Sequence, residues 1–370
     1  MQHKIKSVDV HLVSLPLPDD LADSTKKMGQ AGLTIVRITT DQGLEGHGIT
    51  NNNIGGGQAA RSLIERGFAP ELIGRDPLAS GAIWHDLFLN VRGFGRKGLA
   101  FCAISAVDIA LWDLKGKIFG LPLYRLLGGS DPRVAVYGSG GWTSHSDDAL
   151  VEEARNWVRQ GYHIIKIKVG VEGGRNPARD IRRVRKVREA IGPDVKLLID
   201  ANNCWDAATA VQFANNVRDC TIFFFEEPVP ADDIPGLARF KRGTDIPLAT
   251  GEHEYTKFGV RDLVIAEAVD VVQADVMRAG GITEMLKIAA ITEAWNLKFA
   301  PHCVEYVHMH LVAAVPNALF VERLNILEDI DAHVFRNAPL PVDGYLQIPD
   351  LPGLGLELNM DFIKDHDERA

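Results

Sequence analysis

Two lysines lie two residues apart in the apolar stretch GYHIIKIKVG, and they are the first candidates for chemistry in this chain. If the stretch is a β-strand, Lys166 and Lys168 point to one face, while Ile165, Ile167 and Val169 point to the other. Two ammonium groups on a buried face repel each other and lose hydration, so they require an anionic partner. An edge strand with one face in water is the alternative for this stretch taken alone.

Charged or imidazole groups end seven successive apolar runs, and they are Lys168, Asp200, Glu226, Glu252, Asp275, His302 and Glu322. Neighbouring members are separated by about one strand and one helix, and the two steps that join Asp200, Glu226 and Glu252 are each 26 residues long. A single acid at a strand end is usually a helix cap or a solvated loop residue. Seven groups with this regular spacing instead predict that they share one cavity.

The three acids Asp200, Glu226 and Glu252 form a set of ligands made only of oxygen atoms. Hard oxygen ligands favour Mg²⁺, or Mn²⁺, over zinc or copper. We therefore expect a divalent cation between these carboxylates. A pair of glycosidase carboxylates without metal is the alternative, but it leaves the third acid and the lysine pair without a task.

The elements that must position these groups follow from hydrophobic periodicity. Lys4 to Leu15 alternates as a strand, residues 33–50 predict a hairpin with its turn at Asp41–Gly43, and helical periodicity dominates from Gln58 to Gly120. From Val134, eight short apolar strands alternate with helical segments. This pattern predicts a parallel α/β architecture, either a TIM barrel or an open doubly wound sheet. The alignment of the polar groups with strand ends favours the barrel. The predicted strands are VAVYGS, HIIKIKV, VKLLIDAN, TIFFFEEP, IPLATGEH, VDVVQADV, LKFAPHC and ALFVERL.

Length and composition limit the classes of protein. The chain has 370 residues, 46% hydrophobic and 24% charged, which suits a globular enzyme with a barrel and a smaller domain. A formal net charge of −9 argues against nucleic-acid or anionic membrane surfaces. The four scattered cysteines imply neither a zinc site nor a disulfide framework. No signal-peptide core and no bilayer-spanning run is present in the sequence, so we expect a cytoplasmic protein.

These motifs together resemble the enolase superfamily, and within it the mandelate racemase subgroup. The resemblance covers nearly the whole chain and implies a modified (β/α)7β barrel over 133–335, an α+β capping domain over 1–125, and a tail over 336–370 that returns to the cap. Specificity is expected in cap loops at about 16–30 and 50–57, the second of them a mobile glycine loop. The residues that carry it are Lys166-Ile-Lys168, Asp200 with Asn202, Glu226-Glu227-Pro228, Gly251-Glu252, Asp275 before Gly280-Gly281, Pro301-His302 and Glu322-Arg323.

The resemblance also implies roles for individual residues. Lys168 is expected to act as the base, with its pKa lowered by the second ammonium and the metal, and Lys166 to bind the substrate carboxylate. His302 is expected opposite Lys168, with Asp275 holding its tautomer and raising its basicity. The resemblance makes Glu322 a partner of the substrate carboxylate or enediolate. Further substrate contacts are expected from Asn202 and His253, whereas His308 and His310 are interpreted as structural.

Two bases on either side of one carbon permit two reactions. With a leaving group on the next carbon, the outcome is dehydration of a sugar acid to a 2-keto-3-deoxy acid. Without one, it is racemisation or epimerisation of a 2-hydroxy acid. The segment GEHEYTKFG and the polar residues 51–53 favour an aldonate or aldarate dehydratase.

Muconate-type cycloisomerisation is disfavoured because Asp275 stands where that branch carries lysine. A non-enzymatic binding or scaffold barrel is the remaining alternative. A homo-oligomer, dimer or octamer, is expected by resemblance, and the particular sugar acid stays open.

Overall fold

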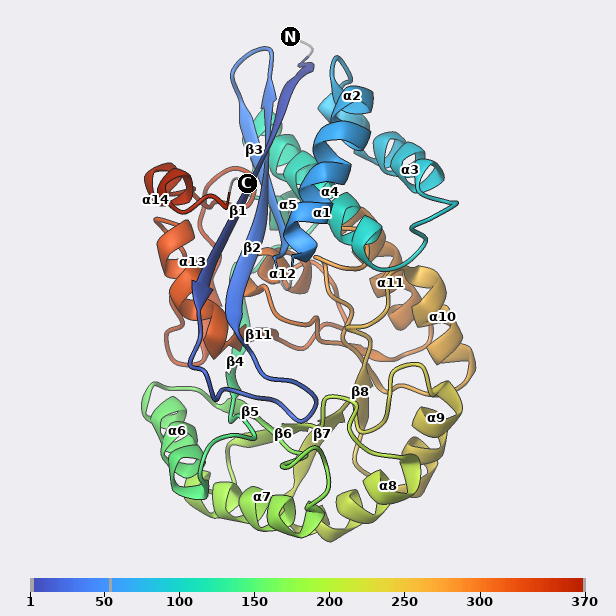
Figure 1. Ribbon diagram of the computed structural model, residues 1–370, viewed down its shortest axis with the longest axis vertical. Helices are drawn as coiled ribbons and strands as arrows, with labels where there is room; N and C mark the ends of the chain where they lie inside the picture. Colours follow the sequence, from blue (N-terminus) through green and yellow to red (C-terminus); the bar gives the residue numbers. More distant parts are fainter. Residues whose placement is uncertain (1–2, 53–54, 369–370) are drawn as a thin grey trace.

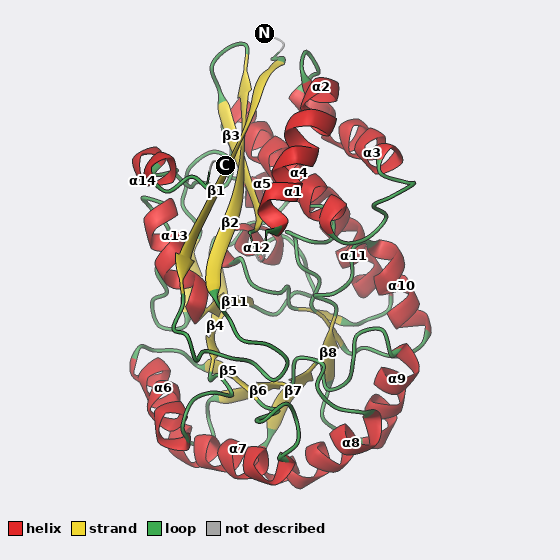
Figure 2. Ribbon diagram, viewed as in Figure 1, coloured by secondary structure: helices red, strands yellow, loops and turns green. Residues whose placement is uncertain are grey.

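A computed structural model describes residues 3–52 and 55–368. A ring of strands surrounded by helices forms the larger part of the molecule, and an antiparallel sheet with several helices lies over one end of that ring (Figure 1). Figure 2 shows that strands line the inside of the ring and helices its outside. This is the barrel-and-cap architecture that the sequence predicts.

The barrel is built from alternating strands and helices. Each predicted strand is present, although those after Ile246 are shorter than the apolar runs that encode them. The strands are β4 (Arg133–Gly140), β5 (Ile164–Lys168), β6 (Lys196–Asp200), β7 (Ile222–Glu226), β8 (Leu248–Thr250), β9 (Val271–Val272), β10 (Lys298–Phe299) and β11 (Val321–Leu324). The helices between them are α6 (Asp147–Arg159), α7 (Pro177–Ile191), α8 (Ala207–Asn216), α9 (Ile234–Gly243), α10 (Lys257–Ile265), α11 (Ile282–Ala294) and α12 (Glu305–Val312).

The order of the strands excludes an open doubly wound sheet. Consecutive strands from β4 to β10 pair in parallel, and β11 pairs in parallel with β4. A parallel bridge between Phe299 and Ala318 joins β10 to the residues just before β11. The sheet therefore closes on itself, and its eight described strands with seven intervening helices form the expected (β/α)7β barrel.

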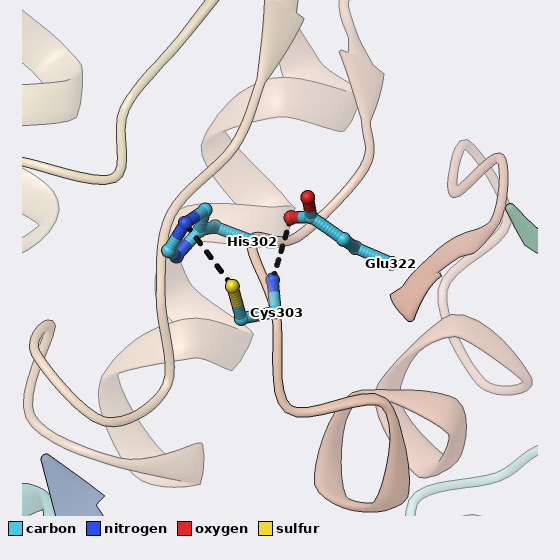
Figure 3. A group of neighbouring side chains, drawn as sticks. All are labelled: His302, Cys303 and Glu322. Atoms are coloured by element: carbon cyan, nitrogen blue, oxygen red, sulfur yellow. Dashed lines mark hydrogen bonds between the residues drawn. The ribbon is translucent and has the colours of Figure 1, made fainter. Parts of the chain in front are cut away.

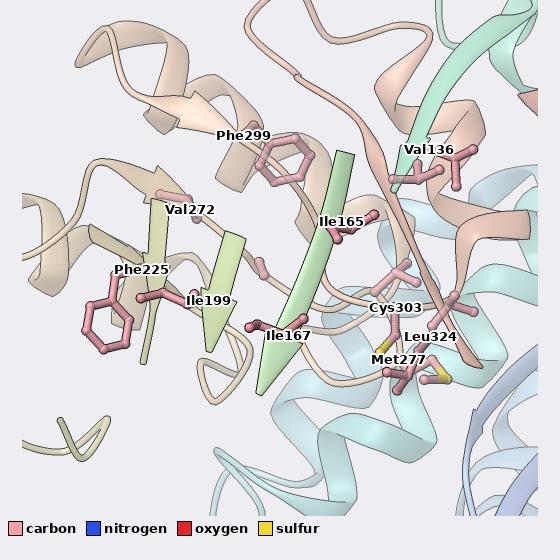
Figure 4. Packing of buried hydrophobic residues seen from close by; sticks show 14 of the residues in the cluster. Val136, Ile165, Ile167, Ile199, Phe225, Val272, Met277, Phe299, Cys303 and Leu324 are labelled. Carbon is pink, nitrogen blue, oxygen red and sulfur yellow. The ribbon is translucent and has the colours of Figure 1, made fainter. Parts of the chain in front are cut away.

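Alternation along the strands decides which side chains face the barrel interior. One cluster of buried apolar residues lies inside the barrel toward the end where the strands begin, and it includes Ile164, Leu198 and Phe224. Two residues further along the same strands come Lys166, Asp200 and Glu226, which point the same way because the side-chain period of a strand is two. The interior is thus apolar at one level and charged at the next. The intervening residues, among them Ile165, Ile167, Ile199 and Phe225, belong to the large core between strands and helices (Figure 4).

The cap consists of a three-stranded antiparallel sheet and helices packed on it. The strands match the predicted first strand and hairpin, and the long helix α4 ends at Gly120, which adopts the left-handed conformation with φ of 67°. The elements are β1 (Ile5–Pro16), β2 (Gln30–Thr40), β3 (Glu45–Asn51), α1 (Gly56–Leu63), α2 (Ala69–Leu72), α3 (Ser80–Asn90), α4 (Leu99–Phe119) and α5 (Leu123–Leu126).

The predicted mobile loop over 50–57 is wrong at both ends. Its first residues belong to β3, and Gly56 already begins α1. Asn52 is 1% exposed, its backbone N–H donates to Gly32 O at 3.0 Å, and Gly57 lies so close to its side chain that a Cβ there would clash. Gly57 therefore permits tight packing at the start of α1, and the mobility of the segment stays a prediction. Asn53 lies outside the described residues.

The C-terminal segment contacts both parts of the molecule. After α13 (Glu328–Val334), β12 (Tyr345–Gln347) pairs antiparallel with β4, and α14 (Met360–Asp365) precedes Glu368, whose N–H donates to Leu12 O at 2.8 Å. Figure 1 shows α14 on the side of the cap where β1 lies. The domain limits at 125, 133 and 335 stay predictions. Within the described ranges, no helix combines the length and the apolar character that crossing a bilayer requires.

Asp113 of α4 fastens this tail to the cap. Its fully buried carboxylate accepts hydrogen bonds from His47 N at 2.9 Å, Lys117 Nζ at 2.7 Å and Leu354 N at 2.8 Å. We expect Asp113→Ala to lower the free energy of unfolding by about 2–6 kcal/mol, because two buried N–H donors lose their acceptor at about 1–3 kcal/mol each. Urea unfolding measures this. The exposed Asp365→Ala is the control, and equal stability of both variants would contradict the assignment.

Candidate active site

The two lysines of β5 enter a buried network of carboxylates. Lys166 Nζ lies 2.7 Å from Glu226 Oε2, 2.7 Å from Glu322 Oε1 and 4.0 Å from Asp200 Oδ2. Lys168 Nζ lies 2.5 Å from Asp200 Oδ2. Lys166, Asp200 and Glu226 are fully buried, and Glu322 is 1% exposed. The anionic partner that the lysine pair requires is therefore supplied by the ends of the neighbouring strands β6 and β7 and by β11.

His302 and Asp275 form the predicted dyad. Nδ1 of His302 lies 3.0 Å from Asp275 Oδ2, and Asp275 Oδ1 accepts from Met277 N at 2.7 Å. Burial alone would raise the pKa of Asp275, but Arg278 and His302 lower it, so the carboxylate accepts and Nδ1 carries the proton. The other ring nitrogen, Nε2, lies 3.3 Å from Glu252 Oε2. Asp275 thus occupies Nδ1, and Nε2 is the ring nitrogen on the side of Glu252 that can exchange a proton with a bound molecule.

Cys303 connects the dyad to Glu322. Its sulfur lies 3.2 Å from His302 Nε2, and its backbone N–H donates to Glu322 Oε2 at 2.9 Å (Figure 3). Burial raises the pKa of the Cys303 thiol to about 12, so it stays neutral. No cysteine motif marks Cys303 in the sequence. Its importance comes only from its position beside His302.

The pKa of Lys168 departs from the sequence expectation. Burial lowers the pKa, but the contact with Asp200 raises it. Together these effects raise the pKa of Lys168 above its ordinary value, in spite of repulsion from Lys166. In this arrangement a carboxylate in direct contact outweighs a second ammonium. The expected lowering also requires a metal ion at Asp200, and it stays a prediction. For His302, burial lowers the pKa, but the hydrogen bond to the Cys303 sulfur and the carboxylates of Glu252 and Asp275 raise it well above its ordinary value. An imidazolium is suited to donate a proton.

A cavity of about 650 Å³ opens between the barrel and the cap. Its barrel side is lined by five predicted site residues, and Lys166, Asp200, Glu226, Asp275 and Glu322 lie beneath or behind them. The five are Lys168, Asn202, Glu252, His253 and His302. The cap side is formed by residues 25–32 and Asn51, so the two expected specificity segments both reach the cavity.

The three expected metal ligands are not gathered around one point in this arrangement. Among the described residues, the groups of three whose ligand atoms lie within 4.8 Å of one another are His302, Cys303 and Glu322, and Glu227, Glu252 and His253. Lys166 and Lys168 contact Glu226 and Asp200, while Glu252 Oε1 lies 3.1 Å from Arg278 Nη1.

The chemistry of the three carboxylates nevertheless fits a hard divalent cation. Glu226 Oε1 is buried without a hydrogen-bond partner in the described part of the chain. Burial, against the opposing effect of Lys166, raises the pKa of Glu226 to about 8, so its charge is poorly compensated. A cation that takes oxygen ligands would supply the missing partner for Asp200, Glu226 and Glu252.

Two further residues of this site were not predicted from the sequence. Arg278 bridges Glu252 and Asp275, with Nε lying 3.2 Å from Asp275 Oδ2. Gln273 donates from Nε2 to Glu226 Oε2 at 2.7 Å. Gln273 stands two residues before Asp275 in an apolar strand, and that alternation could have revealed it. Arg278 lies in a loop, where no periodic signal exists.

The other two histidines of this region have structural partners. His308 accepts from Val276 N at 3.1 Å and donates to Cys303 O at 2.7 Å. His310 accepts from Tyr124 N at 3.2 Å and donates to Leu354 O at 3.1 Å. Burial lowers the pKa of each to about 4, so both stay neutral. His253 is different, because its half-exposed ring lies 2.9 Å from Glu227 Oε1 at the edge of the cavity.

Comparison with known proteins agrees with this architecture. Residues 149–362 match the enolase C-terminal domain-like family, and residues 7–128 match the mandelate racemase/muconate lactonizing enzyme N-terminal domain. An arabinonate dehydratase of Saccharolobus solfataricus is 33% identical over 87% of this chain and 87% of its own length. A 3,6-anhydro-α-L-galactonate cycloisomerase of Streptomyces coelicolor is 34% identical over 96% and 98% of the two chains.

A solved structure extends the similarity to the whole chain. The L-talarate/galactarate dehydratase of Salmonella typhimurium LT2, liganded with Mg and L-lyxarohydroxamate, superimposes with a TM-score of 0.92 at 33% identity. The match covers 100% of this chain and 94% of that one. Both domain families and relatives of this identity and coverage point to the same assignment. The chain belongs to the mandelate racemase/muconate lactonizing enzyme family of the enolase superfamily.

Proposed function

We propose that this protein is a Mg²⁺-dependent dehydratase of a sugar acid, an aldonate or an aldarate, that forms a 2-keto-3-deoxy acid. The observation that carries the proposal is the presence of Lys168 and the His302–Asp275 pair in one cavity, above the carboxylates of Asp200, Glu226 and Glu252. Relatives named as dehydratases of arabinonate and of talarate or galactarate support it. Cytoplasmic location and homo-oligomerisation stay predictions.

The substrate carboxylate would be bound by Lys166, with Glu322 accepting a hydrogen bond from the acid or from its enediolate. Asn202 and His253 would contact hydroxyl groups of the sugar chain. The Asn202 side-chain oxygen is buried without a hydrogen-bond partner in the described part of the chain, and Nδ2 of the same amide donates to Asp200 Oδ2 at 3.2 Å. A hydroxyl donor would satisfy it.

Lys168 would remove the proton from C2, breaking the C–H bond and leaving an enediolate. Asp200, Glu226 and Glu252 would hold a divalent cation, whose positive charge would stabilise that dianion. His302 Nε2 would then donate its proton to the 3-hydroxyl as the C3–O bond breaks, so that water leaves. The resulting enol becomes the 2-keto acid. Asp275 keeps Nε2 directed at the leaving oxygen.

The proposal is tested by incubating the protein with Mg²⁺ and a library of aldonic and aldaric acids, and by assaying 2-keto acid. Deuterium incorporation at C2 or loss of optical rotation without keto acid would favour a racemase or epimerase. Turnover of neutral glycosides without metal would indicate a glycosidase. No metal dependence and no product from any acid would leave a binding or scaffold barrel.

Cycloisomerisation is a second candidate, because a relative 34% identical to this chain is named as a cycloisomerase of a 3,6-anhydro sugar acid. Loss of the C2 proton and cleavage of the C3–O bond apply equally to such a substrate. When O3 belongs to a ring, the expelled oxygen stays attached and the product is an isomer. Including a 3,6-anhydro acid in the library, and comparing the masses of substrate and product, separates this reaction from dehydration.

Substitution of His302 by asparagine separates the two steps. We expect His302→Asn to lose dehydration by about 10²–10⁴-fold, since the general acid is removed. Exchange of the C2 proton with solvent should continue, because Lys168 remains. Proton NMR in D₂O measures exchange and product together. His333→Asn, at an exposed site on α13, is the control, and loss of exchange in His302→Asn would contradict the assigned roles.

A further inference from the structure

Two lysines of the cap, Lys26 and Lys27, line the active-site cavity together with Lys168 and His302. Both are exposed, and neither takes part in an ion pair within the described ranges. They belong to the segment between β1 and β2 that covers the mouth of the barrel. Two unpaired ammonium groups in a substrate cavity favour a ligand that carries an anionic group.

The turn that carries these lysines is fastened to the barrel. Ser24 Oγ donates to Ala201 O at 2.6 Å, next to Asp200, and Thr143 Oγ1 donates to Asp23 O at 2.6 Å. The first bond joins the turn to the end of β6, and the second joins it to the loop after β4. Lys26 and Lys27 are therefore held at the cavity by hydrogen bonds between side-chain hydroxyls and backbone carbonyls of the two parts.

The segment between β1 and β2 carries three acids, Asp19, Asp20 and Asp23, and within the described ranges none of them forms an ion pair with the two lysines. Asp23 is 8% exposed, and its Oδ1 accepts from Thr25 N at 2.6 Å, Thr25 Oγ1 at 3.0 Å and Lys26 N at 2.8 Å. Its carboxylate thus holds the shape of the turn.

The permanently charged groups on the barrel side of the cavity already have partners. Lys168 contacts Asp200, and Arg278 contacts Glu252 and Asp275. Lys26 and Lys27 differ from them because both are exposed and neither forms an ion pair within the described ranges. The cationic side chains at the barrel end of the cavity are therefore paired, whereas the two lysines at its cap end are not.

We propose that Lys26 and Lys27 bind a second carboxylate, at the opposite end of the substrate from the carboxylate held by Lys166, so that the preferred substrates are aldarates. This inference rests on the proposed function of the same site. Charge-assisted hydrogen bonds from two ammonium groups stabilise a terminal carboxylate. The terminal hydroxymethyl group of an aldonate leaves both charges uncompensated, and that difference gives specificity.

The test measures binding apart from turnover. Isothermal titration calorimetry with the Lys168→Ala protein and Mg²⁺ compares six-carbon aldarates, galactarate among them, with aldonates of the same configuration, such as galactonate. We expect at least one aldarate to bind about 10- to 100-fold more tightly than its paired aldonate. Adding Lys26→Met and Lys27→Met should remove this preference. Lys6→Met, an exposed lysine on β1 outside the cavity, should preserve it.

Two outcomes overturn the inference: no aldarate binds more tightly than its paired aldonate, or the preference survives in the double variant. A turnover arm with otherwise unaltered protein guards against a misfolded Lys168→Ala variant. There the ratio of kcat/KM for aldarate over aldonate should fall by the same factor in the double variant, and an unchanged ratio counts against the assignment. Absence of keto acid from every substrate, with the binding preference intact, would reject the dehydratase and leave the second carboxylate site in place.

Discussion

Replacing Lys168 with alanine is expected to lower kcat for keto-acid formation by about 10²–10⁴-fold, the usual contribution of a general base. Lys168 lines the cavity and its Nζ lies 2.5 Å from Asp200 Oδ2, so it stands between the substrate and the proposed metal ligands. Exchange of the C2 proton with D₂O should be lost in parallel, because the same group removes that proton. Proton NMR of substrate and product measures both quantities in one sample.

Lys196→Ala is the matched control for this substitution. Lys196 lies at the start of β6, the neighbouring strand, but at the opposite end of the barrel, where its ammonium lies over Phe223. Its removal should leave both rates within a factor of about two, as is usual for an exposed side chain away from the site. If Lys168→Ala retains C2 exchange at a comparable rate, another group is the base and the assignment is wrong.

Asp200→Asn is expected to raise the Mg²⁺ concentration for half-maximal activity by at least about 100-fold. Removing a residue that hydrogen-bonds to a metal ligand already lowers the metal affinity by about 10- to 100-fold, and we expect removal of a direct ligand to lower it further. The substitution keeps the size of the side chain and the acceptor for Asn202 N, which now lies 2.7 Å from Asp200 Oδ1. It therefore tests the charge of the ligand and leaves the packing in place.

The measurement has two parts: activity as a function of Mg²⁺ after removal of metal by a chelator, and the increase in Tm on addition of Mg²⁺, which reports binding without turnover. Asp219→Asn is the control, because this carboxylate is largely exposed and lies outside the cavity. An unchanged Mg²⁺ requirement in Asp200→Asn would exclude Asp200 as a ligand.

The barrel was predictable because each of its elements carries a local signal. Every barrel strand is a short apolar run, and the segments between them have helical periodicity. The orientation of Lys166 and Lys168 followed from alternation alone, and the structure places Ile165 and Ile167 in the core on the other face. The cap loops were harder, because the residues that settle their conformation are far apart in sequence. Asn52, which is fastened by Gly32 and packed against Gly57, is the example.

The sequence by itself determined which groups lie at the ends of the barrel strands, since parallel strands joined by helices bring those ends to one rim. The tertiary structure alone decided which of them touch. It placed Asp200 against Lys168, brought Arg278 between Glu252 and Asp275, and set Lys26 and Lys27 at the mouth of the cavity. The physical reason is that strand periodicity fixes direction within one element, whereas charge pairing depends on distances between elements.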